Sequence, residues 1–194
     1  MFINRSRRCP LHCDIPSPSE SIAAYINAKD SNRPHLLDTA FTADASLRMH
    51  VLTDAISFPP ALVGREAIAD TLVRRFNQTY ENIYTLCIGE PPEADAQIYS
   101  CDWFVAMSEK QSGAVRVGCG RYDWSFTANH NQVQSLEIRI VAMENFPAET
   151  LRSVMNVVTA MPYPWCGRQL AERALAGSTT LRRVLEFLRR NGAD

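Results

Sequence analysis

Residues 115–141 read VRVGCGRYDWSFTANHNQVQSLEIRIV and alternate apolar and polar side chains on both sides of a polar turn. Side chains two positions apart share one face of a β-strand. Each half therefore predicts a strand with one face toward a core or pocket and the other face away from it. The asparagines of the turn at 128–131 tolerate a positive φ. The apolar positions are Tyr122, Trp124 and Phe126 in the first half and Leu136, Ile138 and Ile140 in the second.

Two glycines lie inside the first of these strands, Gly118 and Gly120. A glycine within a strand commonly marks a β-bulge or a sharp bend of the sheet. A slip of one residue in register exchanges the two faces of a strand. The division into inside and outside therefore depends on the register at these glycines.

Helical and strand-like patterns flank this hairpin. Ser17 and Glu20 have the spacing of a capping box, with Pro18 between them at the first helical position. A short helix is expected after Pro34 and a third from Gly64. Consecutive strands after a helical start indicate an α+β fold with a mostly antiparallel sheet. The predicted strands cover residues 45–52, 81–89 and 96–108 and, for the hairpin itself, 114–127 and 132–144; further helices are expected after Pro147, over 168–176 and from Ser178.

The bulk composition excludes several classes of protein. The 194 residues carry a net charge of −1, which gives no general attraction to nucleic acid or to an anionic membrane. No apolar run approaches the roughly 20 residues of a membrane span. No apolar stretch follows the N-terminal arginines, so we expect no secretory signal and a cytoplasmic location.

The cysteines predict neither a disulfide framework nor a metal site. Cys87, Cys101 and Cys119 lie in strand-like segments, where thiols behave as small apolar groups. Cys9, His12 and Cys13 supply three ligand types in the N-terminal tail, but a closed zinc site needs four ligands. We therefore expect no metal and no cofactor.

The order of elements resembles the NTF2-like superfamily, which includes SnoaL-like polyketide cyclases and ketosteroid isomerase. The resemblance covers about residues 18–145 and is carried by Ala24-Tyr25-Ile26, by residues 40–47, by residues 64–68 and by the hairpin. It implies a cone of curved sheet and N-terminal helices around a pocket. The predicted organisation is a flexible tail (1–16), an NTF2-like domain (17–146) and a C-terminal helical extension (147–194) that covers the pocket or braces a dimer.

The same resemblance implies candidate site residues. Tyr25 matches the tyrosine of ketosteroid isomerase that donates to the substrate oxyanion. Met49 stands where that enzyme has its general-base aspartate, and Tyr122 stands where it has a protonated carboxylic acid. A thioether cannot abstract a proton, so the isomerase reaction is not carried over.

In the pocket that the resemblance implies, Tyr25 and Tyr122 are expected to converge as two phenols. Tyr25 and Tyr122 can donate hydrogen bonds to a carbonyl or enolate oxygen, which would make them the catalytic candidates. The alternative is that they are core aromatics whose hydroxyls meet backbone or water. The predicted ligand-binding residues are Met49, Tyr99, Cys101, Trp103, Trp124 and Ile140.

Charged residues of the strands belong, by parity, to the opposite face. We expect them to form cross-strand pairs that are solvated or buried in a homodimer through the outer sheet face. His50 and Asp54 form a second catalytic hypothesis, an acid–base pair. The arginines of the last helix are expected to be solvated. The outer set comprises Asp102, Arg121, Asp123, Glu137 and Arg139.

These observations favour a protein that binds an apolar or aromatic small molecule. Any reaction would be that of a cofactor-independent isomerase, cyclase or dehydratase. The alternative is a non-catalytic dimeric module that binds a partner protein or supports an enzyme subunit. An open cavity of several hundred Å³ would favour the first hypothesis, and a cavity filled by its own side chains would favour the second.

Overall fold

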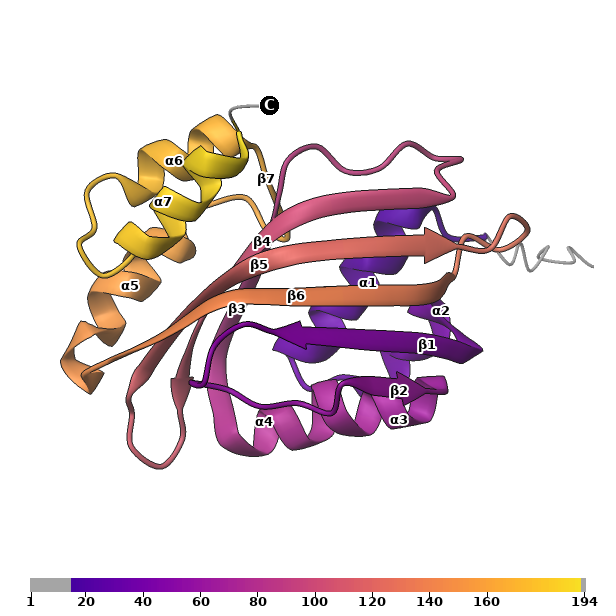
Figure 1. Cartoon of the computed structure of the whole chain (residues 1–194), viewed down its shortest axis with the longest axis horizontal. Helices are drawn as coiled ribbons and strands as arrows, with labels where there is room; N and C mark the ends of the chain where they lie inside the picture. The colour runs from indigo at the N-terminus through magenta and orange to yellow at the C-terminus, as the bar shows by residue number, and fades with distance from the viewer. Residues whose placement is uncertain (1–14, 193–194) are drawn as a thin grey trace, which may run out of the picture.

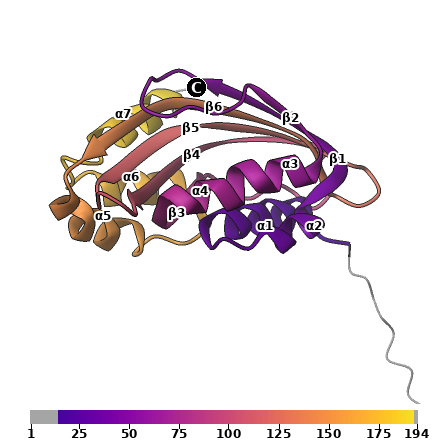
Figure 2. The ribbon, with the colours of Figure 1, turned by 90° about the horizontal axis from the view of Figure 1, so that it is seen from below.

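The computed structural model describes residues 15–192 and contains one curved, unclosed sheet with helices on both faces (Figures 1 and 2). Seven strands form this sheet in the order β2-β1-β6-β5-β4-β3-β7. All neighbouring pairs are antiparallel except β1 with β6 and β3 with β7. The strands are β1 (Phe41–Val51), β2 (Ala61–Val63), β3 (Tyr80–Ile88), β4 (Ile98–Glu109), β5 (Val115–Phe126), β6 (Val133–Phe146) and β7 (Trp165–Cys166). The predicted α+β class is confirmed.

The N-terminal helices fill the concave side, where the sheet arches over them (Figure 2). The capping box of α1 is confirmed, because Ser17 Oγ accepts from the Glu20 amide and Glu20 Oε2 accepts from the Ser17 amide at 2.7 Å. These elements are α1 (Pro18–Asp30), η1 (Pro34–Leu36), α2 (Leu37–Ala40), α3 (Arg65–Ala69), the π-helical η2 (Asp70–Arg75) and α4 (Phe76–Thr79).

The predicted bulge lies beside Gly120. Cys119 pairs with Ala142 and Gly120 pairs with Ile140, so Val141 is the extra residue on β6. A Cβ at position 120 would overlap the Arg139 carbonyl oxygen and would come within 2.9 Å of the Trp103 ring. Glycine at this position therefore lets β4, β5 and β6 approach closely while Trp103 keeps its place on the inner face.

The two faces of the sheet carry separate apolar cores. The inner core contains Tyr25, Trp103, Tyr122 and Trp124, as the parity of the hairpin predicts. Phe104 and its neighbours of the other parity are also fully buried, in a second core on the outer face. This outer core is closed by the C-terminal helices, which are η3 (Ala148–Thr150), α5 (Leu151–Val158), α6 (Arg168–Leu175) and α7 (Arg182–Asn191).

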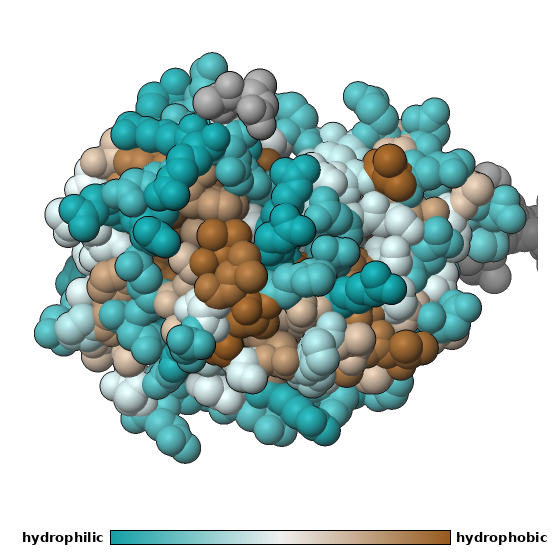
Figure 3. Space-filling view, viewed as in Figure 1, coloured by the Kyte–Doolittle hydropathy of each residue, from teal (hydrophilic) through white to brown (hydrophobic). Residues whose placement is uncertain are grey.

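The position of the C-terminal extension corrects two predictions. The extension covers part of the outer sheet face instead of covering the pocket. Asp102 is 1% exposed, because α6 and α7 lie over it, so it is neither solvated nor available to a second subunit. The face that these helices leave uncovered is mostly hydrophilic (Figure 3). Any dimer through the outer face must therefore use this remaining part.

Smaller differences concern the ends of elements. Ser178 does not cap the last helix, which begins at Arg182 after the N-cap Leu181; the Ser178 hydroxyl accepts from the Leu181 amide in the preceding turn. The two short strands β2 and β7 have no alternating pattern, and neither was predicted. Asn131, in the predicted turn, has a φ of 51°. The predicted tail and the residues Cys9, His12 and Cys13 lie outside the described residues, apart from positions 15 and 16. No helix within residues 15–192 has the length and apolar character needed to span a bilayer.

Candidate functional site

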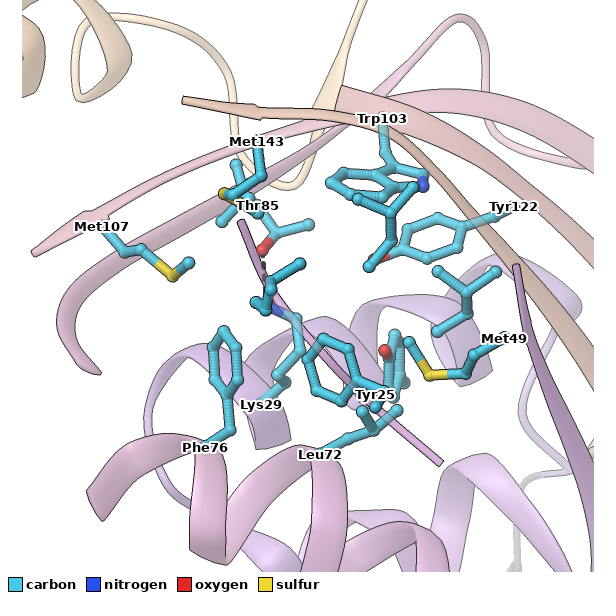
Figure 4. Close-up of a pocket in the computed structure, with 15 residues that line it drawn as sticks. Tyr25, Lys29, Met49, Leu72, Phe76, Thr85, Trp103, Met107, Tyr122 and Met143 are labelled. Carbon is cyan, nitrogen blue, oxygen red and sulfur yellow. Dashed lines mark hydrogen bonds between the residues drawn. The ribbon is translucent and has the colours of Figure 1, made fainter. Parts of the chain in front are cut away.

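A small cavity lies between the inner sheet face and the helices α1, η2 and α4 (Figure 4). Its volume is about 40 Å³, room for a few water molecules. Tyr25 and Lys29 reach it from α1, and Trp103 and Tyr122 reach it from β4 and β5. The cavity thus lies within the inner core.

Two phenols form one side of the cavity. The rings of Tyr25 and Tyr122 meet edge to face with centroids 6.2 Å apart. Burial raises the pKa of both hydroxyls above the ordinary value of a tyrosine. Both therefore stay protonated at neutral pH and are able to donate a hydrogen bond.

A buried ion pair forms the second polar feature. Lys29 Nζ donates to Asp30 Oδ1 and to Thr85 Oγ1, each at 2.6 Å, and both charged side chains are under 10% exposed. Lys29 and Thr85 line the cavity, and Figure 4 draws the bond between them. The ammonium also lies 5.2 Å from the centroid of the Phe76 ring, within cation–π range. One end of the cavity thus has a buried ion pair whose positive charge is compensated by Asp30.

Aromatic rings hold the phenols in place. Trp103 stacks on Tyr122 with centroids 5.2 Å apart and an interplanar angle of 24°. Trp124 packs edge to face against Tyr25 at 5.5 Å and against Tyr122 at 5.3 Å. The indole N–H groups of Trp103 and Trp124 are buried, and neither finds an acceptor in the part of the chain that the structure describes. Such unpaired donors are unusual in a core.

Flexible side chains form the remaining wall. Methionines reach the cavity from three strands, at Met49, Met107 and Met143. Phe58 and Phe76 stack at 6.4 Å near the partly exposed rim. A thioether side chain has three rotatable bonds and adapts to gaps of different shape. This wall can therefore rearrange with less strain than one of branched residues.

Comparison with known proteins gives a likeness in structure only. The sequence matches no protein-family model and no curated protein. It superimposes on a nuclear transport factor 2 (NTF2-like) superfamily protein from Salmonella enterica with a TM-score of 0.51 and 17% identity, over 64% of this chain and 88% of that one. A Mycobacterium tuberculosis protein, RV0760c, gives a TM-score of 0.52 and 9% identity over 67% and 97%. The chain has the NTF2-like fold.

Five of the predicted site residues meet at the cavity of this NTF2-like chain, namely Tyr25, Met49, Trp103, Tyr122 and Ile140. The other three do not line it. Tyr99 donates to the Glu90 carbonyl at 2.6 Å and packs against Trp165, and Cys101 lies buried in the inner core. Trp124 packs against the rings of Tyr25 and Tyr122 but does not itself line the cavity.

Lys29 and Thr85 were missed from the sequence. Lys29 stands four residues after Tyr25, the spacing that puts two side chains on one helix face. That spacing could have identified it. Nothing local links Thr85 to the pair, because its contact with Asp30 joins positions 55 residues apart.

Acid–base groups are scarce around this NTF2-like cavity. Within residues 15–192, no carboxylate and no histidine belongs to its lining. His50 contacts Glu137 at 3.0 Å on the outer face, so the structure does not bring it to Asp54. No cluster of three or more potential metal ligands occurs among the residues that are described.

Proposed function

We propose that this chain binds a small, mainly apolar or aromatic molecule that carries an oxygen acceptor. One observation supports the proposal most directly: Tyr25, Tyr122 and Lys29, three residues that carry hydrogen-bond donors, line a cavity whose exposed surface is otherwise apolar. Ligand pockets typically combine an apolar lining with a few placed polar groups. A carbonyl or phenolic oxygen fits this set of donors.

An organic ligand requires the cavity to expand. About 40 Å³ is too small for an aromatic ring system. We expect rotation of Met49, Met143 and Phe76 to enlarge the space, so that the ligand replaces their packing. The ligand class is therefore a compact molecule of one or two rings.

The chemistry that this site supports is stabilisation of an oxyanion. Protonated phenols in a mainly apolar site stabilise charge that develops on a carbonyl oxygen, while the charge of Lys29 is already compensated by Asp30. The described lining offers no carboxylate to remove a proton. An isomerase, cyclase or dehydratase of this design would act through positioning and hydrogen bonding, without a cofactor.

The small volume favours a second candidate, a non-catalytic dimeric module. In this case the inner core binds no ligand and only stabilises the fold. The uncovered outer face near Arg48, Ser125 and Glu137 is then the dimer interface. Sedimentation velocity separates the two candidates in part: a stable dimer without any retained ligand supports the module.

Removal of either phenolic hydroxyl tests the ligand site. The protein as purified is searched by native mass spectrometry for a retained molecule, and mono- and bicyclic aromatic ketones are screened by thermal shift. For a compound that binds, we expect Tyr25→Phe and Tyr122→Phe each to weaken binding about two- to tenfold, because each loses one hydrogen bond.

Tyr99→Phe is the matched control for these two variants. Its hydroxyl bonds to the Glu90 carbonyl and does not line the cavity, so ligand affinity should not change. If all three variants bind equally well, the two phenols do not contact the ligand and the proposal is wrong.

A further inference from the structure

Four arginines surround one groove on the outer sheet face, next to the C-terminal helix α7. Arg121 and Arg139 come from β5 and β6, and Arg183 and Arg190 come from α7. The groove has a volume of about 380 Å³, within the range of small-molecule sites. It lies on the opposite face of the sheet from the cavity described above, so it is independent of the proposed function.

The two strand arginines repel each other. Arg121 and Arg139 occupy directly facing positions of the β5–β6 pair. Like charges at such positions destabilise a sheet. Arg139 meets Glu137 only at 3.8 Å, while Arg121 contacts Asp123 at 3.3 Å and Asp102 at 3.8 Å. These contacts compensate part of the repulsion, and Arg139 has the more distant carboxylate.

The helix α7 adds two further positive charges to the same groove. Arg183, Phe187 and Arg190 follow at intervals of four and three residues, so they form one stripe of the helix. Arg190 approaches Glu186 only at 3.9 Å. Arg183 has no ion pair among the residues described.

A buried polar contact fixes this helix against the sheet. Asp102 accepts hydrogen bonds from Arg168 Nη2 at 2.7 Å and from Asn191 Nδ2 at 3.1 Å. Asn191 itself lines the groove. The arginines of α7 are therefore held beside those of the sheet.

Apolar side chains complete the wall. Phe187 and Val141 line the groove together with Cys119, whose thiol stays protonated because burial raises its pKa to about 12. No carboxylate lines the groove within the described part of the chain. In Figure 3, apolar surface on this face lies between hydrophilic side chains.

We propose that this groove binds a small organic phosphate, with the phosphate held by the arginines and an apolar group resting on Phe187. Guanidinium groups bind phosphate oxygens through paired, charge-assisted hydrogen bonds. An anion also relieves the repulsion between Arg121 and Arg139. The net charge of −1 makes an extended polyanion such as nucleic acid a poorer fit than a single phosphate group.

Titration calorimetry with phenyl phosphate tests this site in the full-length protein, at constant ionic strength set with sodium chloride. We expect saturable binding at one site per chain, and tighter binding of phenyl phosphate than of inorganic phosphate. Arg183→Gln should weaken binding about tenfold, because one charge-assisted interaction is lost.

Arg189→Gln is the matched control. Arg189 is exposed on the same helix, has no ion pair among the described residues and does not line the groove. Binding should be unchanged in this variant, and thermal unfolding checks that both variants fold. No saturable binding, an equal loss in both variants, or equal affinities for the two phosphates would each overturn the proposal.

Discussion

Replacement of Asp30 by alanine is expected to lower the free energy of unfolding by about 3–5 kcal/mol, the usual cost of removing one partner of a buried ion pair. The Asp30 carboxylate accepts hydrogen bonds from Lys29 Nζ at 2.6 Å, from the Thr85 amide at 2.6 Å and from its hydroxyl at 2.9 Å, and from Tyr163 at 3.1 Å. Alanine leaves the Lys29 ammonium buried without its counter-ion. Urea denaturation followed by circular dichroism measures the change.

Two comparisons establish that the charge causes this loss. Lys29→Met added to Asp30→Ala should recover part of the stability, because the unpaired ammonium is removed. Asp38→Ala breaks a pair with Arg65 in which the Asp38 side chain is 72% exposed, and it should cost less than about 1 kcal/mol. Equal losses for Asp30→Ala and Asp38→Ala would show that the buried pair has no special role.

The strand register was predictable because the hairpin alternates without interruption from Tyr122 to Phe126 and from Leu136 to Ile140, and the second register shift, at Gln134, lies outside these stretches. Tyr122 and Trp124 lie on the inner face as expected, and the bulge at Val141 comes just beyond Ile140. The bulge therefore shifts only the following residues of β6. Had β5 itself carried an extra residue between Tyr122 and Trp124, these two side chains would have pointed to opposite faces of the sheet. The alternating pattern would then have predicted the wrong face for one of them.

The sequence of β4 also indicates the outer core, through an apolar run that an analysis of alternation alone overlooks. Residues 103–107 read WFVAM, so both faces of β4 are apolar at its centre. A strand that is apolar on both faces is buried on both faces. Phe104 and Ala106 thus indicate that some element covers the outer face. Local sequence patterns do not identify this element, because the residues that cover Phe104 come from the last quarter of the chain.

The polar contacts of the candidate site were less predictable than its apolar wall. Burial of an aromatic side chain follows from its own chemistry and its place in a strand. The partner of a buried charge depends on distant segments, as in the contact of Tyr163 with Asp30 across 133 positions. Asp102 shows the same limit, since its partners Arg168 and Asn191 lie in helices that local patterns place on neither face of the sheet.

Removal of the residues after Phe146 is expected to abolish stable folding, although strands β1 to β6 and the N-terminal helices are all retained in the sequence. The truncation exposes five large apolar side chains of the sheet, each 2% exposed or less, at Leu86, Ile88, Phe104, Val115 and Val117. Their burial contributes on the order of 10 kcal/mol in total, comparable with the whole stability of a typical domain. Soluble yield, gel filtration and circular dichroism of the truncated chain measure the effect.

A polar variant of the truncated chain separates loss of burial from loss of the helices themselves. Leu86→Thr, Phe104→Thr and Val117→Thr keep side chains that suit a strand but remove the exposed apolar surface. This variant should regain solubility while the unmodified truncation aggregates. A soluble, monomeric truncation with the thermal stability of the full chain would show that the extension is only an appendage. The expected result instead makes the outer core, and with it the groove beside α7, an integral part of the fold.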